Sequence, residues 1–318
     1  MSREHSLPNQ SLLTNPSNPH SLIPNPFRAY AAWIDVCLIW GTTYLAIRIS
    51  LETIPPLLMA AMRWVVAGGL LIALLKLRGE RLPAPRAWPA LTVLGVLLLG
   101  FGNGAVVWAE QTVPSGLTAV LVAMSPFWMV GIDALMPDGE ALTLRRIVGL
   151  VVGFGGIVML VWPEIRVGDD GRAFLTGVIS AQIACIGWAI GSSYARRRGR
   201  SHAKDENVLA TAAFEMLFGG IVLLVAALAL HETARLTFTP RSGGALVYLI
   251  FVGAVGGFSA YAYALKHLPV ATVSLYAYVN PIIAVILGTL MLKEPFSARI
   301  ALAGLIVLAG SALVRAET

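Results

Sequence analysis

The stretch that decides the fold is PVATVSLYAYVNPIIAVILGTLMLKEP, residues 269–295, because an earlier stretch repeats the spacing of its prolines. The earlier stretch is PSGLTAVLVAMSPFWMVGIDALMPDGE, residues 114–140. A separation of 155 residues relates Pro114 to Pro269 and also relates Pro126 to Pro281. We therefore interpret the chain as a duplication of one apolar unit.

The composition is that of a membrane protein, with 57% hydrophobic residues, 13% charged residues and a mean hydropathy of +0.76. Soluble domains carry about 25% charged residues. A membrane-spanning helix needs about 20 mostly apolar residues. Ten runs meet this requirement approximately: Tyr30–Ser50, Leu57–Lys76, Ala90–Glu110, Gly116–Met136, Leu144–Trp162, Phe174–Tyr194, Val208–Leu230, Gly244–Leu265, Val270–Leu292 and Arg299–Val314. The sequence thus predicts an all-α membrane protein with ten transmembrane helices.

Each half of the duplication holds five predicted helices, and five is an odd number. The second half must therefore cross the membrane in the opposite sense, which makes the repeats inverted, as in many secondary transporters. We predict a disordered cytoplasmic tail over 1–28, a first repeat with five helices over 29–165 and a second over 173–316.

Lysine and arginine residues give the predicted orientation, because they favour cytoplasmic loops. With the N-terminus inside, 15 of the 23 fall on the inner side and 7 on the outer side, and Arg63 lies within a helix. Both termini are therefore predicted to be cytoplasmic. The basic run ARRRGRSHAK, residues 195–204, is interpreted as an inner loop, so we expect no nucleic-acid partner.

Several functional classes lack sequence support. The ten runs use nearly the whole chain, and it shows neither a phosphate-binding loop nor metal-ligand spacing. We therefore expect no enzyme activity, no cofactor and no metal, and expect the lipid bilayer and a small-molecule substrate as partners. The GxxxG spacing of Gly149 and Gly153 favours helix packing within a monomer, with a dimer contact as the alternative. Cys37 and Cys185 are interpreted as buried thiols, and a disulfide is left open.

Five motifs carry a resemblance to a known family: WGTTYLAIR from Trp40, MRWVVAGG from Met62, GNGAVVWAEQTVPSG from Gly102, FEMLFGG from Phe214 and YAYVNPIIAVILGTLMLKEP from Tyr276. Together they resemble the drug/metabolite transporter superfamily, in its ten-helix EamA-type branch. The resemblance implies inverted five-helix repeats, cytoplasmic termini and a central cavity. It extends to inner-membrane amino-acid and metabolite exporters, including aromatic amino-acid exporters. The first repeat departs from the second, with LVAMSP where the second has YAYVNP, so the two half-sites differ chemically.

Ionisable residues within predicted helices are functional candidates, because burying a charge in the membrane is costly. Glu215 is the deepest acid, and we expect it either to meet a substrate ammonium or a proton, or to be a hydrogen-bonded packing group. Arg63 lies about two turns inside its helix. An interhelix salt bridge or an extended side chain that reaches the interface is its favoured role, and a contact with a substrate carboxylate is the alternative.

Prolines and aromatic residues supply the other candidates. Pro126 and Pro281 predict kinks, and the preceding Ser125 and Asn280 can bind either a freed backbone carbonyl or a substrate. The predicted cavity residues are Trp40, Tyr44, Asn103, Ser125, Trp188, Glu215, Tyr276, Tyr278 and Asn280. The predicted gating residues are Trp108, Tyr263, Pro126 and Pro281, and Asn103, Glu110 and Gln111 are candidates to line an outer vestibule.

These features predict a multi-pass protein of the inner (cytoplasmic) membrane that exports amino acids, aromatic or otherwise apolar, or related small metabolites by alternating access. The alternative is a multidrug or sugar/metabolite carrier of the same superfamily. Proton coupling through Glu215 and facilitated diffusion both fit the sequence.

Overall fold

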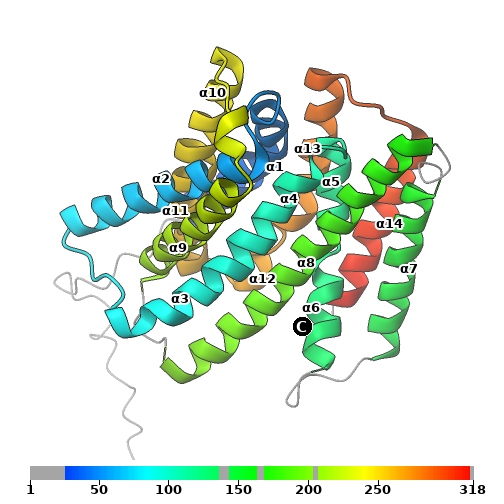
Figure 1. Cartoon of the computed structure of the whole chain (residues 1–318). Coiled ribbons are helices and arrows are strands. Elements are labelled where there is room, and N and C mark those ends of the chain that lie inside the picture. The colour runs from blue at the N-terminus through cyan, green and yellow to red at the C-terminus, as the bar shows by residue number, and fades with distance from the viewer. Residues whose placement is uncertain (1–25, 136–142, 163–167, 203–206, 316–318) are drawn as a thin grey trace, which may run out of the picture.

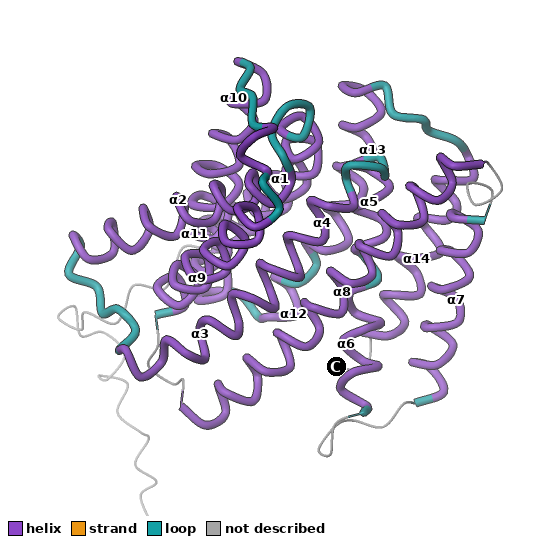
Figure 2. The backbone as a smooth tube through the Cα atoms, in the orientation of Figure 1, coloured by secondary structure: helices purple, strands orange, loops and turns teal. Residues whose placement is uncertain are grey.

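The computed structural model describes residues 26–135, 143–162, 168–202 and 207–315. Helices dominate these residues, which contain no β-strand (Figures 1 and 2). The predicted tail over 1–28 lies almost entirely outside the described residues.

Helices follow one another along the whole described chain. The first half consists of α1 (Pro26–Ser50), α2 (Pro56–Leu77), α3 (Trp88–Leu94), the π-helical η3 (Gly95–Asn103), α4 (Gly104–Ala109), α5 (Ser115–Val122), α6 (Ser125–Ala134) and α7 (Leu144–Val161). The second half consists of α8 (Gly168–His202), α9 (Val208–Ala229), α10 (Pro240–Tyr248), the π-helical η6 (Leu249–Gly256), α11 (Gly257–His267), α12 (Val270–Val273), α13 (Tyr276–Leu292) and α14 (Ala298–Arg315). Short 3₁₀ turns at Pro85–Ala87 and Glu232–Arg235 precede α3 and α10.

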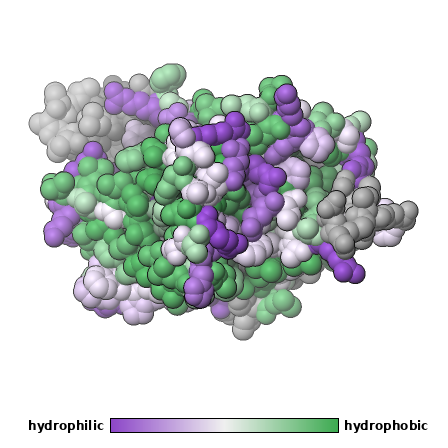
Figure 3. Space-filling view, turned by 45° about the horizontal axis from the view of Figure 1, so that its top comes forward, coloured by the Kyte–Doolittle hydropathy of each residue, from purple (hydrophilic) through white to green (hydrophobic). Residues whose placement is uncertain are grey.

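The helices account for the ten predicted apolar runs. Among the described residues, eight helices are long and apolar enough to cross a membrane, counting α3–η3–α4, α5–α6 and α10–η6–α11 as one helix each. Two further apolar helices, Tyr276–Leu292 and Ala298–Val314, are shorter. The surface fits this assignment: hydrophobic residues cover most of the face in Figure 3, and polar residues form a band across its middle.

Small residues mark antiparallel contacts between equivalent helices of the two halves. In the α2–α9 contact, Gly68 lies against the backbone at Ala213, whereas Gly220 lies against Val65, so the two helices run antiparallel. These helices occupy equivalent places in the two repeats, and an antiparallel contact between equivalent helices is what inversion requires.

The pair α7–α14 behaves in the same way. Gly149 and Gly310 lie against each other, and Gly156 lies against Val307. The GxxxG glycines thus pack within the chain, as predicted, because a missing side chain lets two helix backbones approach closely.

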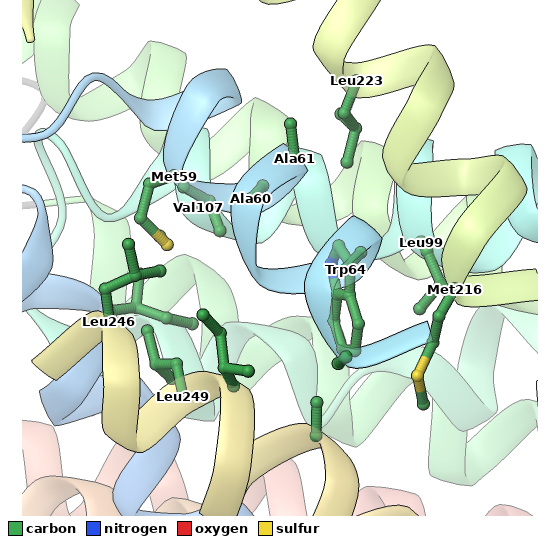
Figure 4. Packing of buried hydrophobic residues seen from close by; sticks show 14 of the residues in the cluster. Met59, Ala60, Ala61, Trp64, Leu99, Val107, Met216, Leu223, Leu246 and Leu249 are labelled. Atoms are coloured by element: carbon green, nitrogen blue, oxygen red, sulfur yellow. The ribbon is translucent and has the colours of Figure 1, made fainter. Parts of the chain in front are cut away.

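A large apolar core joins α2 and α9 to η3, η6 and α10. Trp64 lies in its middle, between Met216 and Leu99 on one side and Leu249 on the other (Figure 4). This cluster fixes α2, and therefore it also fixes the position of Arg63, the residue before Trp64.

Both repeats contain a broken helix. The first break separates α5 from α6 directly before Pro126, as the sequence predicts. The second break separates α12 from α13 at Ser274 and Leu275, whereas Pro281 lies inside α13. The break in the second repeat therefore lies about two turns before Pro281, and the helix continues through the proline.

Candidate functional site

Two neighbouring cavities lie between the halves. The Arg63 cavity has a volume of about 350 Å³ and receives residues from α1, α2, η3–α4, α5–α6, α8, α11 and the α12–α13 segment. The Glu215 cavity has a volume of about 380 Å³ and lies nearer the end of the bundle where α8 ends and α9 begins. Six residues line both cavities: Trp40, Trp188, Ser192, Phe258, Tyr261 and Tyr276. These shared residues form the boundary between the two.

An aromatic cluster forms most of this boundary. The Trp40 ring lies 5.2 Å from Phe258, 5.2 Å from Tyr261 and 4.9 Å from Tyr276, measured between ring centroids. The Tyr276 contact is edge-to-face, a favourable geometry for aromatic pairs. The cluster therefore presents a preformed apolar surface to both cavities.

The two π-helical segments hold the equivalent tryptophans in equivalent ways. A side chain on Gly257, which follows η6, would overlap the indole of Trp40, and one on Gly102 in η3 would overlap the indole of Trp188. Each tryptophan thus occupies space that a glycine leaves free. π-Helical turns are often found at functional sites, and here both lie beside the cavities.

The two indoles differ in their hydrogen bonds. Trp40 Nε1 donates to the carbonyl of Gly253 in η6 at 3.2 Å. Trp188 Nε1 has no acceptor among the described residues, and Trp188 lines both cavities. Its N–H is therefore available to a ligand.

Backbone groups already engage the two polar residues that precede the prolines. Ser125 Oγ donates to the carbonyl of Val122 at 2.7 Å, which is the carbonyl that Pro126 leaves free. The amide of Asn280, oriented by its hydrogen-bond network, donates to the carbonyls of Cys37 and Tyr276 at 3.1 and 3.0 Å. Both residues line the Arg63 cavity, but only Ser125 binds the carbonyl that its proline leaves free, whereas Asn280 joins α13 to Cys37 of α1.

Arg63 lies deep in the bundle and lines its cavity. The residue is only 3% exposed, and its guanidinium carbon lies 4.2 Å from the ring centre of Trp64. No carboxylate of a described residue lies within 4.0 Å of its guanidinium nitrogens. The favoured prediction of a salt bridge or of a side chain extended to the interface is therefore wrong, because the side chain points into the bundle and meets a cavity rather than an acid.

The prediction that Glu110 lines an outer vestibule is also wrong. It is 0% exposed, and its two carboxylate oxygens have no hydrogen-bond partner. It therefore does not line an open vestibule. Arg48 reaches this residue, but Arg48 Nη1 donates to the backbone carbonyl of Glu110 rather than to its carboxylate.

Glu215, on α9, lines the cavity that carries its name, together with Thr211 and Arg198. This is the only acidic residue among the described residues that line either cavity. The structure thus places the deepest predicted acid and the buried arginine in different cavities, with the aromatic cluster between them.

Some of the remaining predicted site residues line a cavity, and others do not. Tyr44, Asn103, Pro126 and Pro281 line the Arg63 cavity. Trp108, Tyr263 and Tyr278 line neither cavity, and Trp108 and Tyr263 are 40% and 38% exposed. Tyr263 packs against His267, with ring centres 4.3 Å apart.

Glu294 was not among the functional residues predicted from the sequence. Its carboxylate accepts hydrogen bonds from Ser115 N and Ser115 Oγ, both at 2.8 Å, and from Gly116 N at 3.1 Å. Glu294 thereby joins the end of α13 to the start of α5, across the two repeats. An acid can cap the start of a helix, because a negative charge is stabilised at a helix N-terminus. Glu294 follows α13, but the sequence does not say which helix start it meets.

A model of the EamA-like transporter family matches residues 29–162 and 175–316. The chain belongs to this family. It is therefore a membrane transporter, and the family ranges cover both halves of the bundle.

Named relatives support the same assignment. The chain is 38% identical over 265 residues to a protein of Escherichia coli strain K12 named as an uncharacterized inner membrane transporter, YedA, and the match covers 82% of this chain and 81% of that protein. It is 24% identical over 278 residues to the transporter YoaV of Bacillus subtilis, with 87% and 93% covered. A solved crystal structure with 22% sequence identity matches with a TM-score of 0.62 and covers 90% of this chain and 97% of its own, which shows a shared fold.

Proposed function

We propose that this EamA-family protein is a secondary transporter of the inner membrane that exports amino acids, aromatic or otherwise apolar, or related small metabolites. The observation that carries the proposal is the aromatic cluster between the two cavities, to which both repeats contribute. A volume of about 350 Å³ is within the usual range of small-molecule sites, about 300–1,000 Å³. Trp40, Tyr261 and Tyr276 offer ring faces and edges to a flat apolar group.

The inverted halves supply a physical basis for alternating access. The shared aromatic residues are the site that stays in place, and rocking of one half against the other exposes one cavity or the other. Trp108 and Tyr263, both partly exposed, keep their proposed role as gate residues at the two ends of the path. The charge distribution of the loops supports cytoplasmic termini.

A multidrug or sugar/metabolite carrier is the second candidate. Glu215 favours it, because it is an acid on a cavity wall, and a carboxylate attracts organic cations. The two proposals differ in which charge the substrate carries.

Transport in proteoliposomes tests the proposal. We would measure uptake of labelled tryptophan, phenylalanine and threonine, with and without a pH gradient, for the wild type and for Glu215→Gln. Glu52→Gln is the matched control, because Glu52 pairs with Arg241 at the surface. We expect saturable uptake of the aromatic substrates, and a pH effect that is lost only in Glu215→Gln would assign proton coupling to that residue. If no amino acid moves, the export proposal fails and the carrier alternative is tested next.

A further inference from the structure

Arg63 is a buried cation that makes no ion pair within 4.0 Å with any described acid. Its Nε atom is buried without a hydrogen-bond partner, and its guanidinium carbon lies 4.2 Å from the ring centre of Trp64. A buried charge that makes no ion pair is costly. An anion bound in the cavity beside Arg63 would stabilise this buried cation.

The nearest candidate for an internal partner is Glu110, and the structure does not form that pair. No salt bridge within 4.0 Å joins Arg63 to Glu110, and both Glu110 oxygens lack hydrogen-bond donors. Glu110 is also absent from the residues that line the Arg63 cavity. The guanidinium therefore lines the cavity without forming an ion pair with this acid.

The rest of the cavity wall favours an anion as well. None of the described residues that line the Arg63 cavity is an aspartate or a glutamate. The side chains of Tyr44, Asn103 and Trp188 line it, and none of the three makes a hydrogen bond to another described residue. Each carries an N–H or O–H donor. The cavity thus combines one cation with three unused donors.

Size and shape narrow the class of ligand. The aromatic cluster lies on the wall that the two cavities share, so a ligand held at Arg63 reaches it with an apolar body. An inorganic anion would leave this surface unused. A guanidinium binds a carboxylate through two parallel N–H···O bonds, which fixes its orientation.

We propose that Arg63 is the carboxylate-binding residue of the transport site, and that the substrates are small organic anions or zwitterions with an apolar or aromatic body. This inference rests on the proposed transport function and narrows it. It assigns the substrate carboxylate to the Arg63 cavity, and it predicts that a purely cationic compound binds there poorly.

Three compounds of similar shape test which ligand charge the site prefers. They are 3-phenylpropionate, which carries only a carboxylate, phenethylamine, which carries only an ammonium, and the neutral 3-phenylpropanamide. Binding is measured on purified wild-type protein in detergent as the ligand-dependent rise in thermal stability, which needs no transport. We expect the carboxylate to stabilise the protein at a concentration at least about tenfold lower than the amine or the amide.

Variants test whether carboxylate binding depends on Arg63. Arg63→Gln is expected to weaken carboxylate binding by about tenfold or more, and Arg63→Lys to weaken it less, because lysine keeps the charge but loses the planar pair of donors. Arg241→Gln is the matched control, since Arg241 pairs with Glu52 at the surface. Glu110→Gln tests the internal alternative and is expected to leave carboxylate binding within about threefold of the wild type, a margin of less than one hydrogen bond.

Equal binding of amine and carboxylate by the wild type, or carboxylate binding that survives in Arg63→Gln, would overturn the inference. A complete absence of carboxylate binding would do the same. If Arg63→Gln does not fold, the three-compound comparison and Arg63→Lys still decide. Failure of the transport proposal looks different, because 3-phenylpropionate would still bind in an Arg63-dependent way while no amino acid moves in liposomes.

Discussion

Removing the Glu294 carboxylate should loosen the start of α5 in a measurable way. This carboxylate accepts three hydrogen bonds, from Ser115 N, Ser115 Oγ and Gly116 N, at 2.8, 2.8 and 3.1 Å. The two amides belong to the first turn of α5, where no carbonyl of the same helix can reach them. Glu294 therefore acts as an N-terminal cap that comes from the other repeat.

The magnitude follows from the number and type of these bonds. A hydrogen bond to a charged group contributes about 1.5–3 kcal/mol, and loss of an N-cap acceptor costs about 1 kcal/mol. Glu294 is only half-buried, so water replaces part of what is lost. We expect Glu294→Ala to lower the free energy of local opening by about 2 kcal/mol, and Glu294→Gln by about 1 kcal/mol, because the amide oxygen of glutamine keeps one acceptor.

Hydrogen–deuterium exchange resolved at Ser115 and Gly116 measures this free energy directly, because amide exchange reports local opening. A loss of about 2 kcal/mol makes exchange about thirtyfold faster. The amide of Leu58 is an internal control, since Glu232 Oε2 caps it in the same way at 2.8 Å. If exchange at Ser115 and Gly116 stays unchanged in Glu294→Ala while Leu58 is also unchanged, the capping argument is refuted.

Three further predictions rest on single contacts. Gly102→Ala should lower stability by about 1–3 kcal/mol and reduce transport, because the added methyl group overlaps the Trp188 indole. Gly100→Ala in the same segment is the control: its methyl group has no neighbour closer than 3.9 Å, so this variant should unfold thermally like the wild type. Gly149→Leu should destabilise the bundle by separating α7 from α14, while Gly155→Leu, which has open space, should not; similar unfolding temperatures for the two would contradict the packing argument. Ser125→Ala should cost about 1 kcal/mol of stability and leave the KM for transport unchanged, since its hydroxyl binds a backbone carbonyl; a raised KM would instead show a substrate contact.

The sequence predicts the helical architecture well, because that architecture depends on local composition. A span of about 20 apolar residues must form a helix in lipid, where every backbone group needs a partner within the segment. The duplication marked by Pro126 and Pro281 then requires inversion, and the antiparallel contact of Gly68 and Gly220 with α9 and α2 agrees with it. The position of the second helix break was not predictable, since α13 continues through Pro281.

The candidate site was predicted only in part. Trp40 and Trp188 were predicted from the sequence as cavity residues, and both line the two cavities. For Arg63 the sequence favoured a salt bridge or an extended side chain over a substrate contact, because whether a buried arginine meets an acid depends on which helix lies opposite. Glu110 is the candidate acid for such a pair, and its carboxylate oxygens accept no hydrogen bond.

The sequence by itself therefore determined the membrane class, the ten apolar helices and the inverted repeat, since each follows from the polarity and order of residues along the chain. Only the tertiary structure decided which polar side chains are satisfied and which face a cavity. Arg63, Ser125 and Glu294 are all polar residues in or beside apolar helices, yet one faces a cavity, one binds its own helix and one caps a helix of the other repeat. The physical reason is that the partner of a polar group is set by distance in space, and the residues that meet here lie up to 179 positions apart in the sequence.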